Sequence, residues 1–144
     1  MDKDEIKSYI PHREPFLFVD KVIEFEPYKR IVAVKTFPKE QEFFKGHFPG
    51  HPVVPGVILT ESLAQAAAVL MGASLEKDEN AENIEGCYLM GLDKVKFRKV
   101  VNPEDVIELH AEVIKLRSKI VTFKADAYVS EAKVAEAEFM ATFY

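Results

Sequence analysis

One apolar segment, from Val57 to Met71, constrains the fold of this chain more than any other feature. A helix that is apolar nearly all round has to be buried inside a protein rather than lie on its surface. Pro55 favours a helix start here, because a proline at the first helical position has no N–H to leave unpaired. We predict a buried helix from about Pro55 to Met71, with Gly72 as its C-terminal stop. Its only polar side chains are those of Thr60, Glu61, Ser62 and Gln65.

The rest of the chain is dominated by segments with the pattern of β-strands. Residues 105–116 alternate most clearly, with Glu108 on one face and Ile107 and Leu109 on the other. Short connections between the last four segments favour antiparallel pairing. The sequence therefore predicts one α+β domain over residues 1–144, with an antiparallel sheet wrapped around the long central helix. The expected strands are 16–25, 30–37, 86–97, 105–116, 120–129 and 133–143, with a short helix at 2–10 and loops at 38–55 and 75–85.

Composition limits the class of protein. The chain has 144 residues, of which 48% are hydrophobic, and this suits a single domain with a sizeable core. The formal net charge of −5 gives no reason to expect a nucleic-acid partner. Cys87 is the only cysteine, so we expect neither an intrachain disulfide nor a thiolate metal site. The charged start lacks the apolar core of a signal peptide, and the apolar tract 64–73 is too short to span a bilayer. We therefore expect a cytoplasmic protein without a membrane segment.

Two ionisable side chains lie beside or within the apolar helix. His47 belongs to the sequence GHFPG, where glycine and proline restrict the loop, and an imidazole can take up a proton at physiological pH. Glu61 is the only acid of the apolar segment, and burial would favour its protonated form. Each residue also has an ordinary interpretation. A loop histidine is often structural or solvated, and a helix glutamate can be satisfied by a backbone N–H or an arginine.

Together with the N–H groups near Gly56, these two residues suit one kind of chemistry. His47 would remove a proton next to a carbonyl, the helix start would polarise that carbonyl, and Glu61 would protonate a leaving β-hydroxyl. This scheme requires no metal and no cofactor. His47 and His51 are four residues apart, but the prolines between and after them prevent the helix that would align them as ligands. The sequence also lacks the glycine motifs of phosphate and dinucleotide sites.

The central stretch GHFPGHPVVPGVILTESLAQ resembles the signature of β-hydroxyacyl-acyl-carrier-protein dehydratases of the FabZ type. The stretches PHREPFLFVD and GLDKVKFRKVVNPED resemble further parts of that family, in the expected order. The resemblance implies a hot-dog fold and a hydro-lyase of bacterial fatty acid synthesis. Such an enzyme converts (3R)-3-hydroxyacyl thioesters of acyl carrier protein into trans-2-enoyl products. The resemblance also implies a homodimer, often assembled into a hexamer as a trimer of dimers, with the base and the acid on opposite protomers.

The resemblance assigns roles to individual residues. His47 and Glu61 match the catalytic histidine and acid, and Gly56 matches the glycine whose backbone N–H binds the thioester carbonyl. Bifunctional dehydratase–isomerases of the FabA type carry aspartate where this chain has Glu61, which favours the general dehydratase. Some members with glutamate also isomerise, so this side activity stays open. The predicted substrate-binding residues are Gly56, Val57, Gln65 and Phe97.

Because acyl carrier protein is acidic, docking requires a basic patch on this acidic chain. Lys94, Lys96 and Arg98 alternate onto one face of a predicted strand, and Lys99 is adjacent to them. We predict that these four cations dock the carrier protein, and that Phe97, on the other face, lines or gates the acyl tunnel. An ordinary solvated strand face has the same pattern.

Two other functions remain open. A hot-dog acyl thioesterase would use the helix acid to activate water and would have no need of His47. A non-catalytic acyl-binding module would keep the tunnel but would not need both ionisable groups. His12, in PHREPF, receives no role from the sequence.

Overall fold

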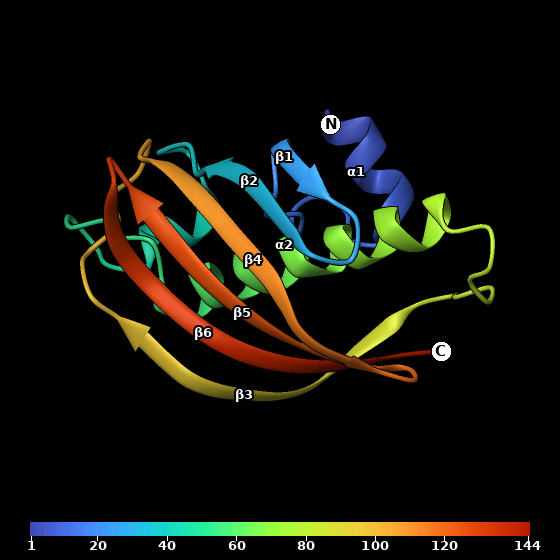
Figure 1. Ribbon diagram of the computed structural model, residues 1–144. Coiled ribbons are helices and arrows are strands. Elements are labelled where there is room, and N and C mark those ends of the chain that lie inside the picture. The colour runs from blue at the N-terminus through green and yellow to red at the C-terminus, as the bar shows by residue number, and fades with distance from the viewer.

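The computed structural model describes residues 1–144 and contains two α-helices, a short 3-10 helix and six strands (Figure 1). All strand pairs are antiparallel, and the order in the sheet is β1-β2-β4-β5-β6-β3. The bounds are α1 Lys3–Tyr9, β1 Lys21–Glu26, β2 Arg30–Thr36, η1 Glu42–Lys45, α2 Gly56–Lys77, β3 Cys87–Phe97, β4 Val106–Arg117, β5 Ile120–Val129 and β6 Ala132–Phe143.

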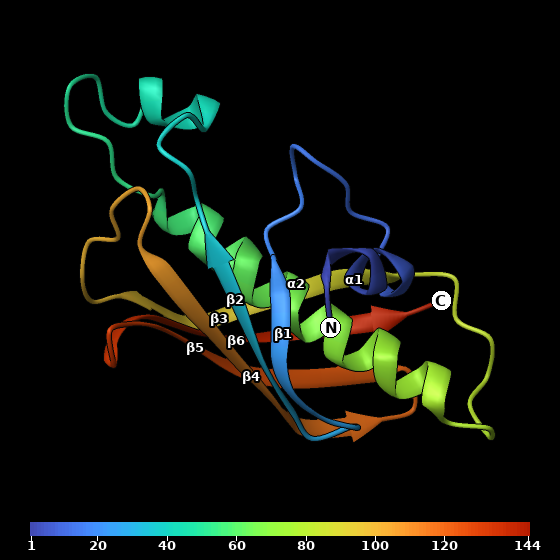
Figure 2. The same cartoon turned by 90° about the horizontal axis from the view of Figure 1, so that it is seen from above.

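The sheet curves around α2, which runs along its concave face (Figures 1 and 2). Side chains that alternate along each strand allow the sheet to cover the helix with one face. On β4, Ile107, Leu109 and Ala111 are buried against the helix while the residues between them face outward. The prediction of an α+β hot-dog fold is therefore confirmed. The same strand order leaves β1 and β3 at the two edges of the sheet.

One cluster of buried apolar side chains joins the helix to the sheet. Burial of apolar surface stabilises a fold by about 25 cal/mol per Å², so the helix and the inner face of the sheet stabilise each other. The helix is also long and apolar enough, by composition, to cross a membrane, but most of that apolar stretch is enclosed by the rest of the protein. Enclosure by the sheet accounts for the apolar character of α2.

The predicted C-terminal end of the central helix was wrong. Helix α2 continues past Gly72 to Lys77. A Cβ atom at Gly72 would lie 2.7 Å from the carbonyl oxygen of Tyr9, at the end of α1. The glycine therefore serves the close approach of two helices, not a helix stop, and the buried hydroxyl of Ser74 stays within the helix by donating to the Leu70 carbonyl (2.6 Å).

The first strand and the central loop also differ from prediction. Strand β1 begins at Lys21 and not at Phe16, because part of the backbone at residues 16–18 bonds to a side chain of α2 instead of to another strand. The loop 38–55, predicted to lack regular structure, contains the short helix η1. The other five predicted strands are confirmed, with ends that shift by one residue at most.

Candidate active site

The loop before α2 fixes the imidazole of His47. Its Nδ1 lies 3.0 Å from the carbonyl oxygen of Val53, and the Val53 N–H donates back to the His47 carbonyl (3.0 Å). The ring also stacks on Phe48, with centroids 4.0 Å apart, and the peptide between these two residues is cis. A carbonyl oxygen only accepts hydrogen bonds, so Nδ1 carries the proton of the neutral ring. The lone pair of Nε2 is then free to act as a base.

Glu61 lies in the second turn of α2, and its side chain is 26% exposed. Its Oε1 accepts a hydrogen bond of 3.0 Å from Nε2 of Gln65, one turn further along the same helix face. Glu61 is therefore less buried than the sequence predicts: one oxygen is fixed by Gln65, while the carboxyl group keeps some access to solvent.

Gln65 is itself fully satisfied by hydrogen bonds. It is buried, its Oε1 accepts from the N–H of Phe18 (2.7 Å), and its Nε2 donates to the carbonyl of Phe16 (3.0 Å) as well as to Glu61. This amide links the extended segment before β1 to α2 and fixes one side of the carboxyl group. The predicted site residue Gln65 therefore contacts Glu61 directly.

The start of α2 supplies backbone donors next to an aromatic ring. Gly56 and Val57 lie in the first turn, where N–H groups have no partner within the helix and the helix dipole is positive. A Cβ atom at Gly56 would lie 2.9 Å from the ring of Phe97, so only glycine lets the ring lie this close. Phe97 is 52% exposed and Val57 73% exposed, so both offer apolar surface at the helix start.

Glu61 borders two cavities. One, of about 270 Å³, lies between the first turns of α2 and strand β3, with Val57, Leu89 and Phe97 in its wall. The other, of about 100 Å³, is mostly apolar and runs inward past Gln65 to side chains of β5 and β6. His47 lines neither cavity, and no hydrogen bond or ion pair joins it to Glu61 within this chain.

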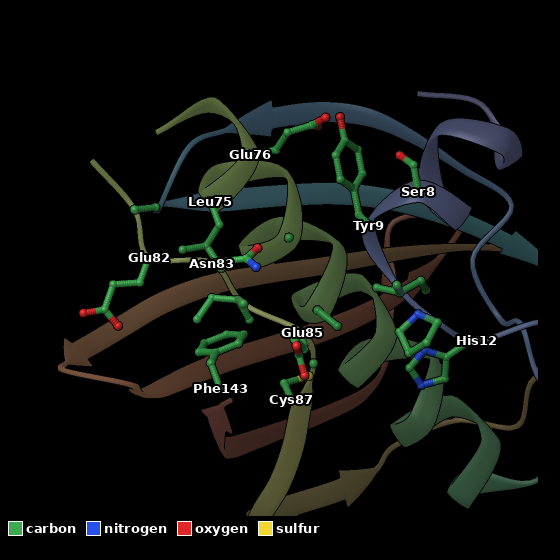
Figure 3. Close-up of a pocket in the computed structure, with 17 residues that line it drawn as sticks. Ser8, Tyr9, His12, Leu75, Glu76, Glu82, Asn83, Glu85, Cys87 and Phe143 are labelled. Atoms are coloured by element: carbon green, nitrogen blue, oxygen red, sulfur yellow. The ribbon is translucent and has the colours of Figure 1, made fainter. Parts of the chain in front are cut away.

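A third and larger cavity, of about 480 Å³, lies between α1, the end of α2 and residues 81–87 (Figure 3). It shares His12, Ala68, Cys87 and Phe143 with the small apolar cavity beside Glu61. Burial is the main cause that raises the pKa of the Cys87 thiol in this wall. Because the two cavities share these wall residues, the space next to Glu61 continues along α2 within one chain.

Sequence reasoning missed that His12 lies beside Glu61. Its Nε2 lies 3.7 Å from Oε1 of Glu61, although the two residues are far apart in the sequence. The segment PHREPF has no hydrophobic period that would place a side chain against α2. Only the tertiary contact of this segment with Gln65 reveals the proximity.

Of the four predicted docking cations, Lys94 and Lys96 lie on an irregular part of β3, whereas Arg98 and Lys99 follow its end at Phe97 and are not strand residues. A β-bulge between Asp93 and Lys96 interrupts the strict alternation, and Lys94 adopts a positive φ of 51°. Lys94 pairs with Glu138 (3.6 Å), and Arg98 Nε donates to Glu136 (3.0 Å). Lys96 and Lys99 make no ion pair in this chain, so their charges are available to a partner.

Comparison with known proteins identifies relatives along almost the whole chain. A family model described as a FabA-like domain matches residues 10–138. A 3-hydroxyacyl-[acyl-carrier-protein] dehydratase FabZ from Caulobacter vibrioides is 46% identical over 141 residues, which cover 98% of this chain and 87% of that protein. Proteins of the same name from Anaeromyxobacter sp. (strain K) and Myxococcus xanthus are 48% and 45% identical, covering 98% and 99% of this chain and 89% and 91% of theirs.

Solved structures share the fold at low sequence identity. The dehydratase heterocomplex ApeI:P from Xenorhabdus doucetiae aligns with a TM-score of 0.83 at 16% identity, over 96% of this chain and 90% of that chain. The protein smu.793 from Streptococcus mutans, solved with acetyl CoA, aligns with a TM-score of 0.65 at 9% identity, over 86% and 87%. At such identities the likeness concerns the fold alone.

Replacing Gln65 by leucine tests the role of its amide. The substitution leaves the N–H of Phe18 and the carbonyl of Phe16 without their partner, and one unpaired buried polar group costs roughly 1–3 kcal/mol. We expect the free energy of unfolding to fall by at least that amount in chemical denaturation. Gln41→Leu is the matched control, because Gln41 makes no side-chain cap hydrogen bond. Equal stability of the two variants would contradict the structural role of Gln65.

Proposed function

The chain belongs to the FabA-like family, and from this membership and the geometry of the site we propose that it dehydrates (3R)-3-hydroxyacyl thioesters of acyl carrier protein. The products are trans-2-enoyl thioesters and water, which makes the protein a hydro-lyase of bacterial fatty acid synthesis. The observation that carries the proposal is the bond from His47 Nδ1 to the Val53 carbonyl, because it leaves Nε2 as a free base. Proteins named for this reaction are 46% and 48% identical to this chain over nearly its whole length, and this similarity supports the choice of substrate.

The proposed mechanism is an elimination with two proton transfers. Nε2 of His47 takes the proton from the α-carbon, and the electrons of that C–H bond form the double bond. The bond from the β-carbon to oxygen breaks, and the carboxyl proton of Glu61 passes to the departing hydroxyl to give water. The N–H of Gly56 donates to the thioester carbonyl, whose oxygen gains charge during the first transfer. The reaction balances with these groups alone, without a metal or a cofactor.

The proposal places the two catalytic residues on opposite protomers of a homodimer. Strand β3 is an edge strand, and a long apolar edge favours pairing with another chain. Pairing of β3 with its copy across a two-fold axis would cover this edge and close the cavity between Glu61 and β3. The large apolar side chains exposed along β3 are Tyr88, Leu89, Met90, Leu92 and Phe97.

Further features of the proposal follow the sequence expectations. Residues 1–144 act as one catalytic domain, the dimer assembles into a hexamer as a trimer of dimers, and the enzyme works in the cytoplasm. The exposed Val57 and Phe97 contact the acyl chain near the helix start. Gln65 contributes through its hydrogen bond to Glu61.

An assay with a 3-hydroxyacyl carrier-protein thioester tests the reaction. We expect enoyl absorbance to rise with the wild-type protein, and His47→Ala and Glu61→Gln each to lower kcat by roughly 10²–10⁴-fold, since each removes one proton-transfer group. Unchanged far-UV circular dichroism is the control for folding. Release of free thiol without enoyl product would replace the proposal by hydrolysis, and binding without turnover would leave an acyl-binding module. A cis-3-enoyl product would add isomerase activity.

Mixed dimers test the location of the site across two protomers. A dimer of one His47→Ala protomer and one Glu61→Gln protomer has one site with both residues intact, provided that they come from opposite chains. We expect randomly reassociated mixtures of the two inactive variants to recover about a quarter of the wild-type activity, because half of the dimers are mixed. Each variant reassociated with itself is the control. A mixture as inactive as its components would place both residues of a site on one chain.

We also propose that the four cations near Phe97 dock the carrier protein. Arg98 and Lys99 line a cavity of about 300 Å³ together with Gly56 and Phe97, so the basic side chains adjoin the helix start where the thioester carbonyl binds. Lys94 and Arg98 already pair with acids of this chain. Lys96 and Lys99 therefore carry most of the attraction for an acidic partner.

Charge reversal tests the docking surface. We expect the double variant Lys96→Glu, Lys99→Glu to raise KM at least tenfold for a carrier-protein thioester, since opposite charges no longer meet, with little change for the same acyl group on pantetheine. The matched control is Lys115→Glu, Lys124→Glu, at two exposed positions of β4 and β5. Equal KM values for the two double variants would refute the assignment.

A further inference from the structure

His12 and Gln65 face the same oxygen of Glu61. Nε2 of Gln65 lies 3.0 Å from Oε1, and Nε2 of His12 lies 3.7 Å from it. The second separation is longer than a hydrogen bond, and catalytic hydrogen bonds that are long before substrate binds commonly tighten in the complex. Neither residue has a polar contact with Oε2. The two oxygens of the carboxyl group therefore have different surroundings.

The segment that carries His12 is held in place by the next residue. Arg13 Nη1 donates to the carbonyls of Ile10 (2.9 Å) and His12 (2.7 Å), and its Nη2 donates to the carbonyl of Lys7 (3.1 Å). One guanidinium thus ties the end of α1 to the backbone at His12. Figure 3 shows the imidazole at the cavity wall beside α2. The hydrogen bonds of Arg13 therefore hold the backbone that places the His12 imidazole next to Glu61.

The surroundings of His12 select one tautomer of its neutral ring. Nδ1 is buried and has no hydrogen-bond partner. A proton on Nδ1 would leave a buried N–H unpaired and would turn the lone pair of Nε2 toward an oxygen of Glu61. A proton on Nε2 avoids both problems, because it points an N–H donor at Oε1. We assign the proton to Nε2.

From this geometry we infer that His12 is a positioning residue that, with Gln65, directs the acidic proton of Glu61 onto Oε2. An oxygen that faces two N–H donors is the carbonyl oxygen of a carboxylic acid, so the O–H lies on the other oxygen. Oε2 is then free to meet the departing hydroxyl of the substrate. This inference rests on the proposed dehydration.

The same two donors favour the transition state over the ground state. As Oε2 loses its proton, negative charge spreads onto Oε1, and hydrogen bonds to a charged oxygen are stronger than those to a neutral one. Interactions that strengthen only in the transition state raise kcat and leave substrate binding unchanged. A histidine that merely fills space beside α2 would have no such selective effect on kcat.

Three substitutions at His12 separate the two roles in the same enoyl assay. His12→Ala should lower kcat roughly 10- to 100-fold, with KM unchanged, because the second donor to Oε1 is lost. His12→Gln should restore most of kcat, since its amide nitrogen reaches the position of Nε2. His12→Asn places its amide near the position of Nδ1 and should remain as slow as the alanine variant.

Controls make each outcome decisive. His110→Ala is the matched variant, because His110 also pairs with a glutamate, Glu108 (3.0 Å), but on the outer face of the sheet; it should keep wild-type kcat. Thermal unfolding midpoints of all variants monitor the fold. A normal kcat for His12→Ala, or a loss that glutamine does not restore, would overturn the role of His12. An active wild-type protein confirms in the same experiment that dehydration itself occurs, whereas an inactive one refutes the proposed function.

Discussion

Enclosure of α2 by the sheet is the constraint on which the rest of the structure depends. An apolar helix inside a curved sheet is stable only if every polar group on it finds a partner, because an unpaired buried group costs free energy comparable to a lost hydrogen bond. Gln65 meets this requirement through three hydrogen bonds to other residues. One of these bonds fixes Glu61. The requirement that stabilises the helix therefore also orients the acid.

The same enclosure explains how much of the structure follows from sequence. The strand at 120–129 is readable because one of its faces is buried and the alternation of its residues records this. The end of α2 is not readable in this way. Gly72 has the usual identity of a helix stop, yet here it faces the Tyr9 carbonyl, a contact between distant parts of the chain that no local pattern encodes.

The candidate site shows the same division. His47, Glu61 and Gly56 stand out in sequence because an imidazole, a lone acid and a helix start follow one another within a short stretch. His12 does not, because its significance lies in a contact with Glu61 across the fold. The predicted alternation of side chains along β3 was also wrong in part, because a β-bulge with Lys94 at positive φ interrupts it. Functional residues that lie close together in the sequence can be recognised from it, whereas contacts between distant residues depend on how the chain packs.

The edge strand β3 connects the stability of the chain to its proposed chemistry. Exposed apolar side chains of β3 line the cavity beside Glu61, which is open to solvent on this side. His47 lies in a different loop of the same chain and has no contact with that acid. A second copy paired along β3 would cover apolar surface and supply the missing wall. Burial of these side chains, at about 25 cal/mol per Å², would then drive the association that assembles the site. In such an arrangement, a substitution that weakens the β3 edge would impair the proposed catalysis without altering His47 or Glu61.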